Sequence, residues 1–199
     1  MAKGALSPRV AKHGPVPGFT PGYLPLSEGW MSTPELDGLR AEAWRQTRNG
    51  RFHALELGVW KGLATSALTL ASPLVICVDT FTGTPGEPCE GTDTFLDFTR
   101  NMRSLDRHNF VVLRTTTDDA LLELLGTPGI GTILVDADHA TAQVARDLRG
   151  AWRLLETDGT MFVDDAEKPG PKAALRAFAP DDLEQVSYVT PKLAALRKR

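Results

Sequence analysis

Short apolar runs alternate with segments of helical spacing along most of the chain. Five mostly apolar runs cover residues 54–57, 74–79, 110–114, 132–136 and 160–165. Runs of this kind are typical of strands that are buried on both faces of a parallel sheet. Between the fourth and fifth runs, apolar residues recur at helical intervals, at Val144, Leu148, Ala151, Trp152 and Leu155. The alternation predicts an α/β fold, in which helices cover both faces of a doubly wound, mainly parallel sheet.

Helix signals support this reading. The segment 32–35, Ser-Thr-Pro-Glu, joins a hydroxyl cap, a first-turn proline and an acid, so we expect a helix to begin there. Asn49 and Gly50 are expected to end it. Its apolar stripe consists of Leu36, Leu39, Ala43 and Trp44. Further helices are expected near residues 63–68, 94–105, 116–125, 140–155 and 173–178.

The two ends of the chain depart from the alternation. Residues 1–30 are rich in proline and glycine and predict an N-terminal extension, disordered up to about residue 18. The apolar stretch 23–31 is expected to pack on the domain, as a lid over a ligand. Two short β-like runs, 186–189 and 193–196, predict a C-terminal antiparallel hairpin. Residues 31–199 should therefore form a single domain with a Rossmann-like sheet.

A glycine turn follows the first predicted strand. The spacing is Glu56-x-Gly58-x-x-x-Gly62, and the residues after it begin a helix. A strand, a tight turn and a helix N-terminus form a nucleotide-type cradle, in which glycine lets a ligand approach the backbone. The turn lacks the Gly-Lys-Ser/Thr ending of a P-loop and the third glycine of the dinucleotide fingerprint. We therefore expect a nucleoside ligand without phosphate, of which S-adenosylmethionine is the common example.

These residues resemble the first motif of the class I S-adenosylmethionine-dependent methyltransferases. The resemblance implies that Glu56, Gly58, Val59 and Gly62 hold the methionine part of S-adenosylmethionine. Asp79 ends the second strand about 20 residues past the turn, as expected for a ribose-binding carboxylate, although it could instead cap a turn.

The sequence leaves two interpretations for the adenine site. Asp118 either bonds the adenine amino group or simply caps the helix that begins beside it. Thr80, Thr117 and Asp136 are neighbouring positions that we also assign to the cofactor.

Acidic residues follow the fourth and fifth strands. They are Asp136, Asp138, Asp164 and Asp165. Adjacent strands lie about 4.8 Å apart, so these carboxylates should crowd together at the ligand-binding edge of the sheet. Crowded carboxylates raise one another's pKa unless a cation intervenes, and a hard divalent ion such as Mg²⁺ prefers oxygen ligands. Alternatively, the acids are separate caps and surface charges.

The segments 135–139, 154–160 and 163–165 resemble metal-dependent small-molecule O-methyltransferases, both the catechol and caffeoyl-CoA type and the macrocin and novobiocic-sugar type. The resemblance implies metal ligation by Asp136, Asp164 and Asp165. It leaves two candidates for the general base, His139 and Asp138. Histidine titrates near working pH, and we slightly favour it.

The expected function is therefore transfer of a methyl group to a hydroxyl of a small molecule, a sugar or catechol-like natural product. The net charge of −3 gives no reason to expect a nucleic-acid or anionic-membrane partner. Two cysteines make no disulfide framework, and no apolar segment reads as a secretory signal or membrane span, so we expect a cytoplasmic protein, which could form homo-oligomers. The alternatives are a metal-independent methyltransferase acting on nitrogen or a carboxylate, a non-catalytic nucleoside-binding protein, and a nicotinamide-dependent oxidoreductase.

Overall fold

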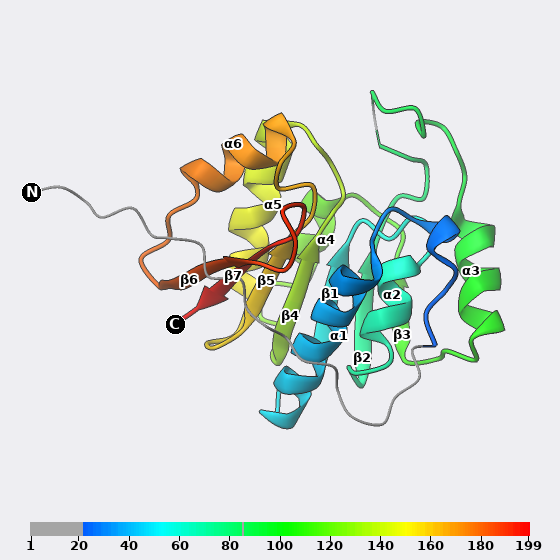
Figure 1. The fold of residues 1–199 in the computed structure, drawn as a ribbon, viewed down its shortest axis with the longest axis horizontal. Coiled ribbons are helices and arrows are strands. Elements are labelled where there is room, and N and C mark those ends of the chain that lie inside the picture. Colours follow the sequence, from blue (N-terminus) through cyan, green and yellow to red (C-terminus); the bar gives the residue numbers. More distant parts are fainter. Residues whose placement is uncertain (1–21, 85) are drawn as a thin grey trace, which may run out of the picture.

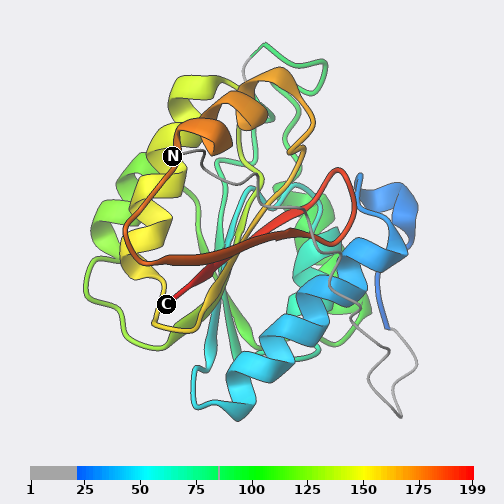
Figure 2. The same cartoon turned by 60° about the vertical axis from the view of Figure 1, so that its left-hand side comes forward.

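The protein forms a single twisted sheet between two layers of helices (Figures 1 and 2). The structure, a computed structural model, describes residues 22–84 and 86–199. The strands are β1 (His53–Leu57), β2 (Leu74–Val78), β3 (Phe110–Leu113), β4 (Ile130–Val135), β5 (Thr160–Val163), β6 (Leu183–Tyr188) and β7 (Ala194–Lys198). Their order is β3-β2-β1-β4-β5-β7-β6. The predicted fold is confirmed: the first five strands are parallel, and β7 pairs antiparallel with both β5 and β6.

The helices divide between the two faces of the sheet. One face carries α1 (Thr33–Arg48), α2 (Leu63–Leu68) and α3 (Phe95–Ser104). The other carries α4 (Thr117–Glu123), α5 (Thr141–Leu154) and α6 (Pro169–Ala177). A short 3-10 turn, Leu26–Glu28, precedes α1. No helix in the described part of the chain is long and apolar enough to cross a membrane.

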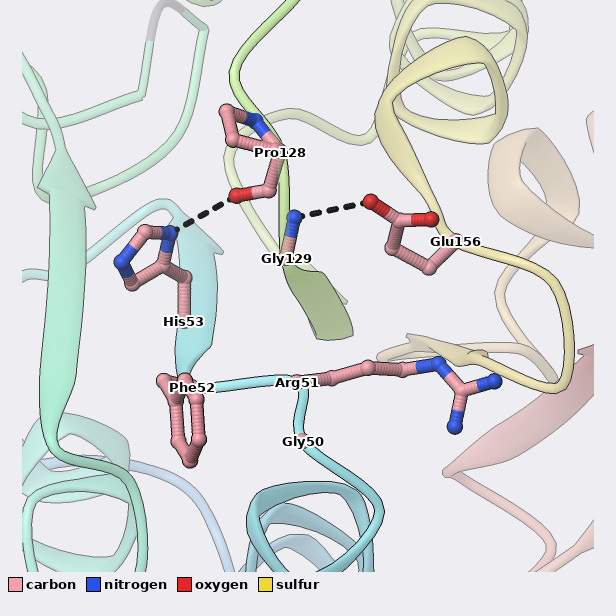
Figure 3. Close-up of a pocket in the computed structure, with 7 residues that line it drawn as sticks. All are labelled: Gly50, Arg51, Phe52, His53, Pro128, Gly129 and Glu156. Carbon is pink, nitrogen blue, oxygen red and sulfur yellow. Dashed lines mark hydrogen bonds between the residues drawn. The ribbon is translucent and has the colours of Figure 1, made fainter.

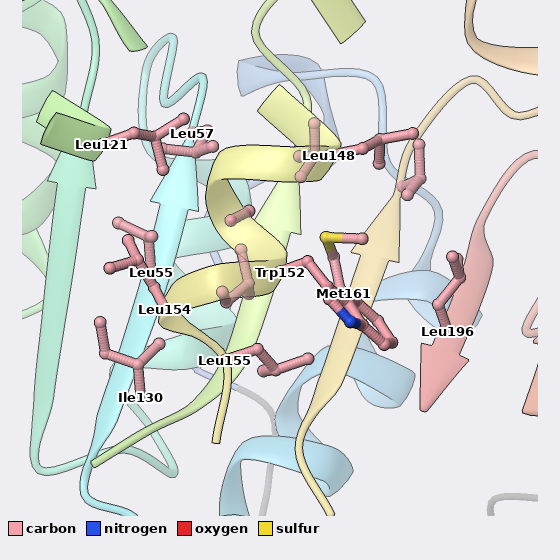
Figure 4. Close-up of a cluster of buried hydrophobic side chains, with 14 of the residues drawn as sticks. Leu55, Leu57, Leu121, Ile130, Leu148, Trp152, Leu154, Leu155, Met161 and Leu196 are labelled. Carbon is pink, nitrogen blue, oxygen red and sulfur yellow. The ribbon is translucent and has the colours of Figure 1, made fainter. Parts of the chain in front are cut away.

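The larger core lies between the sheet and α5. Leu148 and Trp152 from α5 are buried against Leu55 and Met161 of β1 and β5 (Figure 4). Burying a side chain of this size stabilises the fold by about 1.5–3 kcal/mol. This layer fixes α5 against β4, and therefore fixes the loop between them, which carries Asp136, Asp138 and His139.

Several details differ from the expectations. Helix α6 begins at Pro169 rather than at residue 173, because prolines are tolerated in a first turn whose N–H groups have no helical partner. Trp44 was placed in the apolar stripe of α1, yet it is 40% exposed and stacks under Arg48, whose guanidinium lies 4.7 Å from the ring centre. The predicted start and end of α1 are correct: Ser32 N–H donates to Glu35 Oε2 (2.7 Å), and Gly50 adopts a φ of +81°.

The N-terminal stretch 23–31 packs on the domain only in part. Leu24 and Met31 are buried, whereas Leu26 and Trp30 are largely exposed. The expected tail, residues 1–18, lies outside the described residues, and the division of the chain at residue 30 stays a prediction.

Candidate active site

A cavity of about 1100 Å³ opens at the carboxyl ends of the parallel strands. This is the edge at which open α/β sheets bind ligands. It is lined by Glu56, Gly58, Val59, Asp79, Thr80, Thr117, Asp118, Asp136, Asp138, His139, Asp164 and Asp165. The fold thus gathers every predicted site residue except Gly62 around one space.

The two glycines of the turn serve different purposes. Gly58 has a φ of +91°, and a Cβ there would lie 2.2 Å from the carbonyl oxygen of Asp136. Only glycine therefore allows the ends of β1 and β4 to meet. Gly62 also has a positive φ, but a Cβ there would meet Met102 and Phe98 of α3 at 2.8 and 2.9 Å. Gly62 is therefore required for the packing of α3 against the glycine turn.

Glu56 is a buried acid at the end of β1. Its Oε2 accepts a hydrogen bond from the Thr65 hydroxyl (2.6 Å), while Oε1 is buried without a partner among the described residues. Burial raises the pKa of Glu56 to about 8. The side chain lines the cavity, so a positively charged group bound there would find an acceptor at Oε1.

Asp79 holds the glycine turn in place. Its Oδ2 accepts from the backbone N–H groups of Val59 (2.7 Å) and Trp60 (2.8 Å), and its Oδ1 accepts from Phe81 N–H (2.6 Å). This is the turn-capping role that the sequence left as the alternative for Asp79. A carboxylate has about four acceptor positions, so ribose binding by Asp79 is compatible with these bonds and stays a prediction.

The predicted acid cluster forms because β4 and β5 pair in register. Val135 lies opposite Val163, so Asp136 and Asp164 follow at the same level. Asp136, His139 and Asp165 each offer a ligand atom, and these atoms lie within 4.8 Å of one another. Loss of water raises the pKa of Asp136 well above its ordinary value, and the nearby charge of Asp164 raises it further.

Two lysines partly neutralise the cluster. Lys192 Nζ lies 2.6 Å from Asp164 Oδ2, and Lys168 Nζ lies 2.7 Å from Asp165 Oδ2. Burial by itself would raise the pKa of Asp165, but hydrogen bonds from His139 and Lys168 lower it to about 2. At Asp164 burial prevails over Lys192, and the pKa of the carboxyl is raised.

The two candidate bases, His139 and Asp138, differ in their hydrogen-bond and ion-pair contacts. His139 uses both ring nitrogens: Nδ1 lies 3.0 Å from Glu87 Oε1, and Nε2 lies 2.8 Å from Asp165 Oδ2. The contact with Asp165 raises the pKa of His139, and the contact with Glu87 adds to it. Asp138 Oδ1 accepts from Ala140 N–H (2.6 Å) at the start of α5, which leaves Oδ2 as its available acceptor.

Comparison with known protein families identifies a methyltransferase domain in this chain. A sequence model described as a methyltransferase domain matches residues 55–166, more than half of the chain. The chain belongs to this methyltransferase family. No curated protein sequence matches it.

Solved structures share the fold of this methyltransferase at low sequence identity. The O-methyltransferase NovP superposes with a TM-score of 0.70 at 17% identity, covering 86% of this chain and 82% of NovP. TomG, an O-methyltransferase from Streptomyces achromogenes, superposes with a TM-score of 0.61 at 16% identity, covering 85% of this chain and 82% of TomG. An O-methyltransferase from Bacillus cereus superposes with a TM-score of 0.59 at 16% identity, covering 84% of this chain and 82% of the Bacillus cereus chain. The methyltransferase thus has the fold of class I O-methyltransferases, as predicted.

The far end of the methyltransferase cavity is built around α4 and α5. Asp118 is about half exposed and pairs with Arg146 (3.2 Å). Thr117 donates its hydroxyl to Asp147 Oδ1 (2.7 Å), and Gln143 Nε2 donates to the same atom (2.9 Å). Asp147 is fully buried and supports the cavity wall from behind. The adenine assignments of Thr117 and Asp118 stay predictions.

The acid cluster of the methyltransferase is chemically suited to a divalent cation. Asp164 is 4% exposed, and its Oδ1 has no hydrogen-bond partner in the described part of the chain. Carboxylate oxygens are the ligands that Mg²⁺ and Mn²⁺ prefer. Asp136, Asp164 and Asp165, the predicted set, would hold it, and His139 lies beside them with its ring nitrogens in contact with Glu87 and Asp165.

Sequence reasoning missed several cavity residues of this methyltransferase. They are Trp60, Glu87, Lys168 and Lys192, whereas Trp30 belongs to the stretch 23–31 that was expected to cover a ligand. The Trp30 and Trp60 rings are in tilted contact, with 5.0 Å between their centroids, which joins the N-terminal stretch to the glycine turn. Lysines in loops carry no readable pattern, so only their contacts in the fold identify them.

A second hollow, of about 400 Å³, lies at the opposite edge of the sheet (Figure 3). It is formed by the segments that enter β1 and β4, and its polar groups bond one another: His53 Nδ1 lies 3.0 Å from the Pro128 carbonyl oxygen, and Gly129 N–H donates to Glu156. None of the predicted site residues lines it. The larger cavity is therefore the candidate functional site.

Proposed function

We propose that this methyltransferase transfers the methyl group of S-adenosylmethionine to a hydroxyl of a small molecule and uses a divalent cation to do so. The observation that carries the proposal is the crowding of acids in the cavity that the glycine turn also lines, where the ligand atoms of Asp136 and Asp165 lie within 4.8 Å of one another. The related folds of NovP, TomG and the Bacillus cereus enzyme, all named O-methyltransferases, support it.

Cofactor binding is assigned to the turn and its neighbours. Glu56 would accept from the cofactor's amino group, because a positive charge beside a buried carboxyl favours the ionised form. Gly58 lets the turn pack against the Asp136 backbone, and the turn held in this way would border the methionine part. We assign Asp79 to the ribose and Asp118 to the adenine, because both line the cavity.

The acid cluster would bind and orient the acceptor. When bound, the divalent cation would lower the pKa of an acceptor hydroxyl and fix its position. Asp138 Oδ2 would take the proton, since both ring nitrogens of His139 are already engaged. Glu87 and Asp165 then hold the His139 ring in the cluster. The base is thus assigned to Asp138 and the positioning role to His139, whereas the sequence slightly favoured His139 as the base.

The test is methylation of a panel of catechols and glycosides, with and without EDTA, followed by mass analysis of products. We expect EDTA to abolish turnover and Mg²⁺ or Mn²⁺ to restore it. Asp138→Asn should remove turnover while S-adenosylhomocysteine still binds, and the exposed Asp181→Asn is the control. Full turnover in EDTA would refute the metal role, and a fully active Asp138→Asn would refute the base.

A second candidate is a metal-independent methyltransferase acting on nitrogen or a carboxylate. The observation in its favour is that Lys192 and Lys168 already neutralise Asp164 and Asp165. Turnover of amine or carboxylate substrates that is insensitive to chelators would support it over the first proposal.

A further inference from the structure

Lys192 occupies an unusual place in the acid cluster. It precedes β7, and its side chain is 21% exposed. Its ammonium lies 2.6 Å from Asp164 Oδ2, 3.8 Å from Asp165 Oδ1 and 3.1 Å from the carbonyl oxygen of Trp30. One cation therefore contacts two carboxylates of the cluster and the N-terminal stretch at the same time.

We propose that Lys192 is a built-in counter-ion that competes with the divalent cation for Asp164 and thereby weakens the affinity of the site for metal. The inference rests on the metal site of the proposed function and adds a residue that controls it. A metal that binds through Asp164 either displaces the ammonium from Oδ2 or shares the carboxylate with it through the free Oδ1. In both cases the Lys192 ammonium and the divalent cation would lie close together beside the Asp164 carboxylate. Their repulsion costs free energy in a partly buried site.

Lys168 is less suited to this role, although it also pairs with an acid of the cluster. Its side chain is 44% exposed, so its ammonium can turn to solvent when a cation arrives. Lys192 is held at its far side by the Trp30 carbonyl and cannot leave without breaking that bond. Lys192 is therefore the cation whose charge the metal must overcome.

The contact with Trp30 has a further consequence. The Trp30 ring makes a tilted contact with the ring of Trp60 in the glycine turn, with 5.0 Å between their centroids. Lys192 thus links the metal ligand Asp164 to the stretch that borders the mouth of the cavity. Displacement of Lys192 by metal would release its bond to that stretch.

The experiment measures Mn²⁺ binding to the full chain by electron paramagnetic resonance, which does not depend on turnover. We compare the wild type with Lys192→Met, with Lys192→Arg, which keeps the charge, and with Lys172→Met, which removes an exposed lysine of α6. We expect Lys192→Met to bind Mn²⁺ with a dissociation constant at least about tenfold lower than that of the wild type, because a nearby like charge is removed. Lys192→Arg and Lys172→Met should stay within about twofold of the wild type.

Thermal unfolding gives an independent readout. Without metal, Lys192→Met should melt below the wild type, because Asp164 is left buried without its partner. Saturating Mn²⁺ should raise its melting temperature more than that of the wild type. If Lys192→Met does not fold, Lys192→Gln replaces it, since an uncharged amide can still bond Asp164 and Trp30.

The outcomes separate the two proposals. Equal or weaker Mn²⁺ binding by Lys192→Met overturns the counter-ion role and leaves the metal site standing. If no protein binds Mn²⁺ while all of them bind S-adenosylhomocysteine, the metal part of the proposed function fails, and the inference fails with it.

Discussion

Asp147 on α5 should make the stability of this methyltransferase fall as pH rises. The side chain is fully buried, its Oδ1 accepts from Thr117 and Gln143, and its Oδ2 is buried without a partner among the described residues. Burial raises its pKa from 3.8 to about 6, and the nearby charges of Asp118 and Asp138 act in the same direction. In Asp147→Asn, the amide oxygen can accept the same two hydrogen bonds, and the buried charge is gone.

The magnitude follows from proton linkage. The folded state holds the Asp147 proton more tightly than the unfolded state, so the wild type loses stability as pH rises from about 4 to about 6. Each pKa unit is worth about 1.4 kcal/mol, so the full loss is about 3 kcal/mol. We expect Asp147→Asn to match the wild type near pH 4 and to exceed it by about 3 kcal/mol at pH 8, or roughly 6–12 °C in melting temperature.

The assay is urea unfolding, followed by circular dichroism, of both proteins between pH 4 and pH 8. The exposed Asp181→Asn serves as the matched control and should stay within about 0.5 kcal/mol of the wild type at every pH. A variant that is no more stable than the wild type at pH 8 would show that the Asp147 carboxylate carries no burial penalty, and the reasoning would be wrong.

Three further substitutions test the core and the glycine turn. Leu148→Ala should lower the free energy of unfolding by about 2–5 kcal/mol, because it leaves a cavity under α5. Leu122→Ala, at a 69% exposed position, should change it by less than about 0.5 kcal/mol. Similar losses for both variants would contradict the assigned core. Gly58→Ala should destroy S-adenosylhomocysteine binding in calorimetry, because its Cβ would lie 2.2 Å from a backbone oxygen, and intact binding would refute that constraint. Asp79→Ala should weaken S-adenosylhomocysteine binding and lower the melting temperature, because three backbone N–H groups lose their acceptor at about 1–3 kcal/mol each if they stay buried; unchanged values would remove its role in holding the turn.

The layout of this methyltransferase could be predicted because its signals are local. Buried parallel strands appear as apolar runs, and the glycine turn, the Ser32 cap and the Asn49-Gly50 stop each depend on residues within a few positions of one another. The acids at the ends of β4 and β5 were found for a related reason. Strand ends align across a parallel sheet, so consecutive strands that end in acids must bring those acids together.

The roles of individual site residues depend on distant parts of the chain. Lys192 meets Asp164 only because β7 inserts beside β5, and Glu87 meets His139 across 52 positions of sequence. Similarly, Asp79 was assigned to a ligand, and the fold shows that it also holds the backbone of the glycine turn.

The sequence by itself determined the architecture and the edge of the sheet at which the site lies, since apolar periodicity and glycine placement constrain the backbone directly. Only the tertiary structure decided which charges face one another and which are stripped of water. Electrostatic interactions depend on separation and burial in space, and these quantities are properties of the folded chain rather than of residue order.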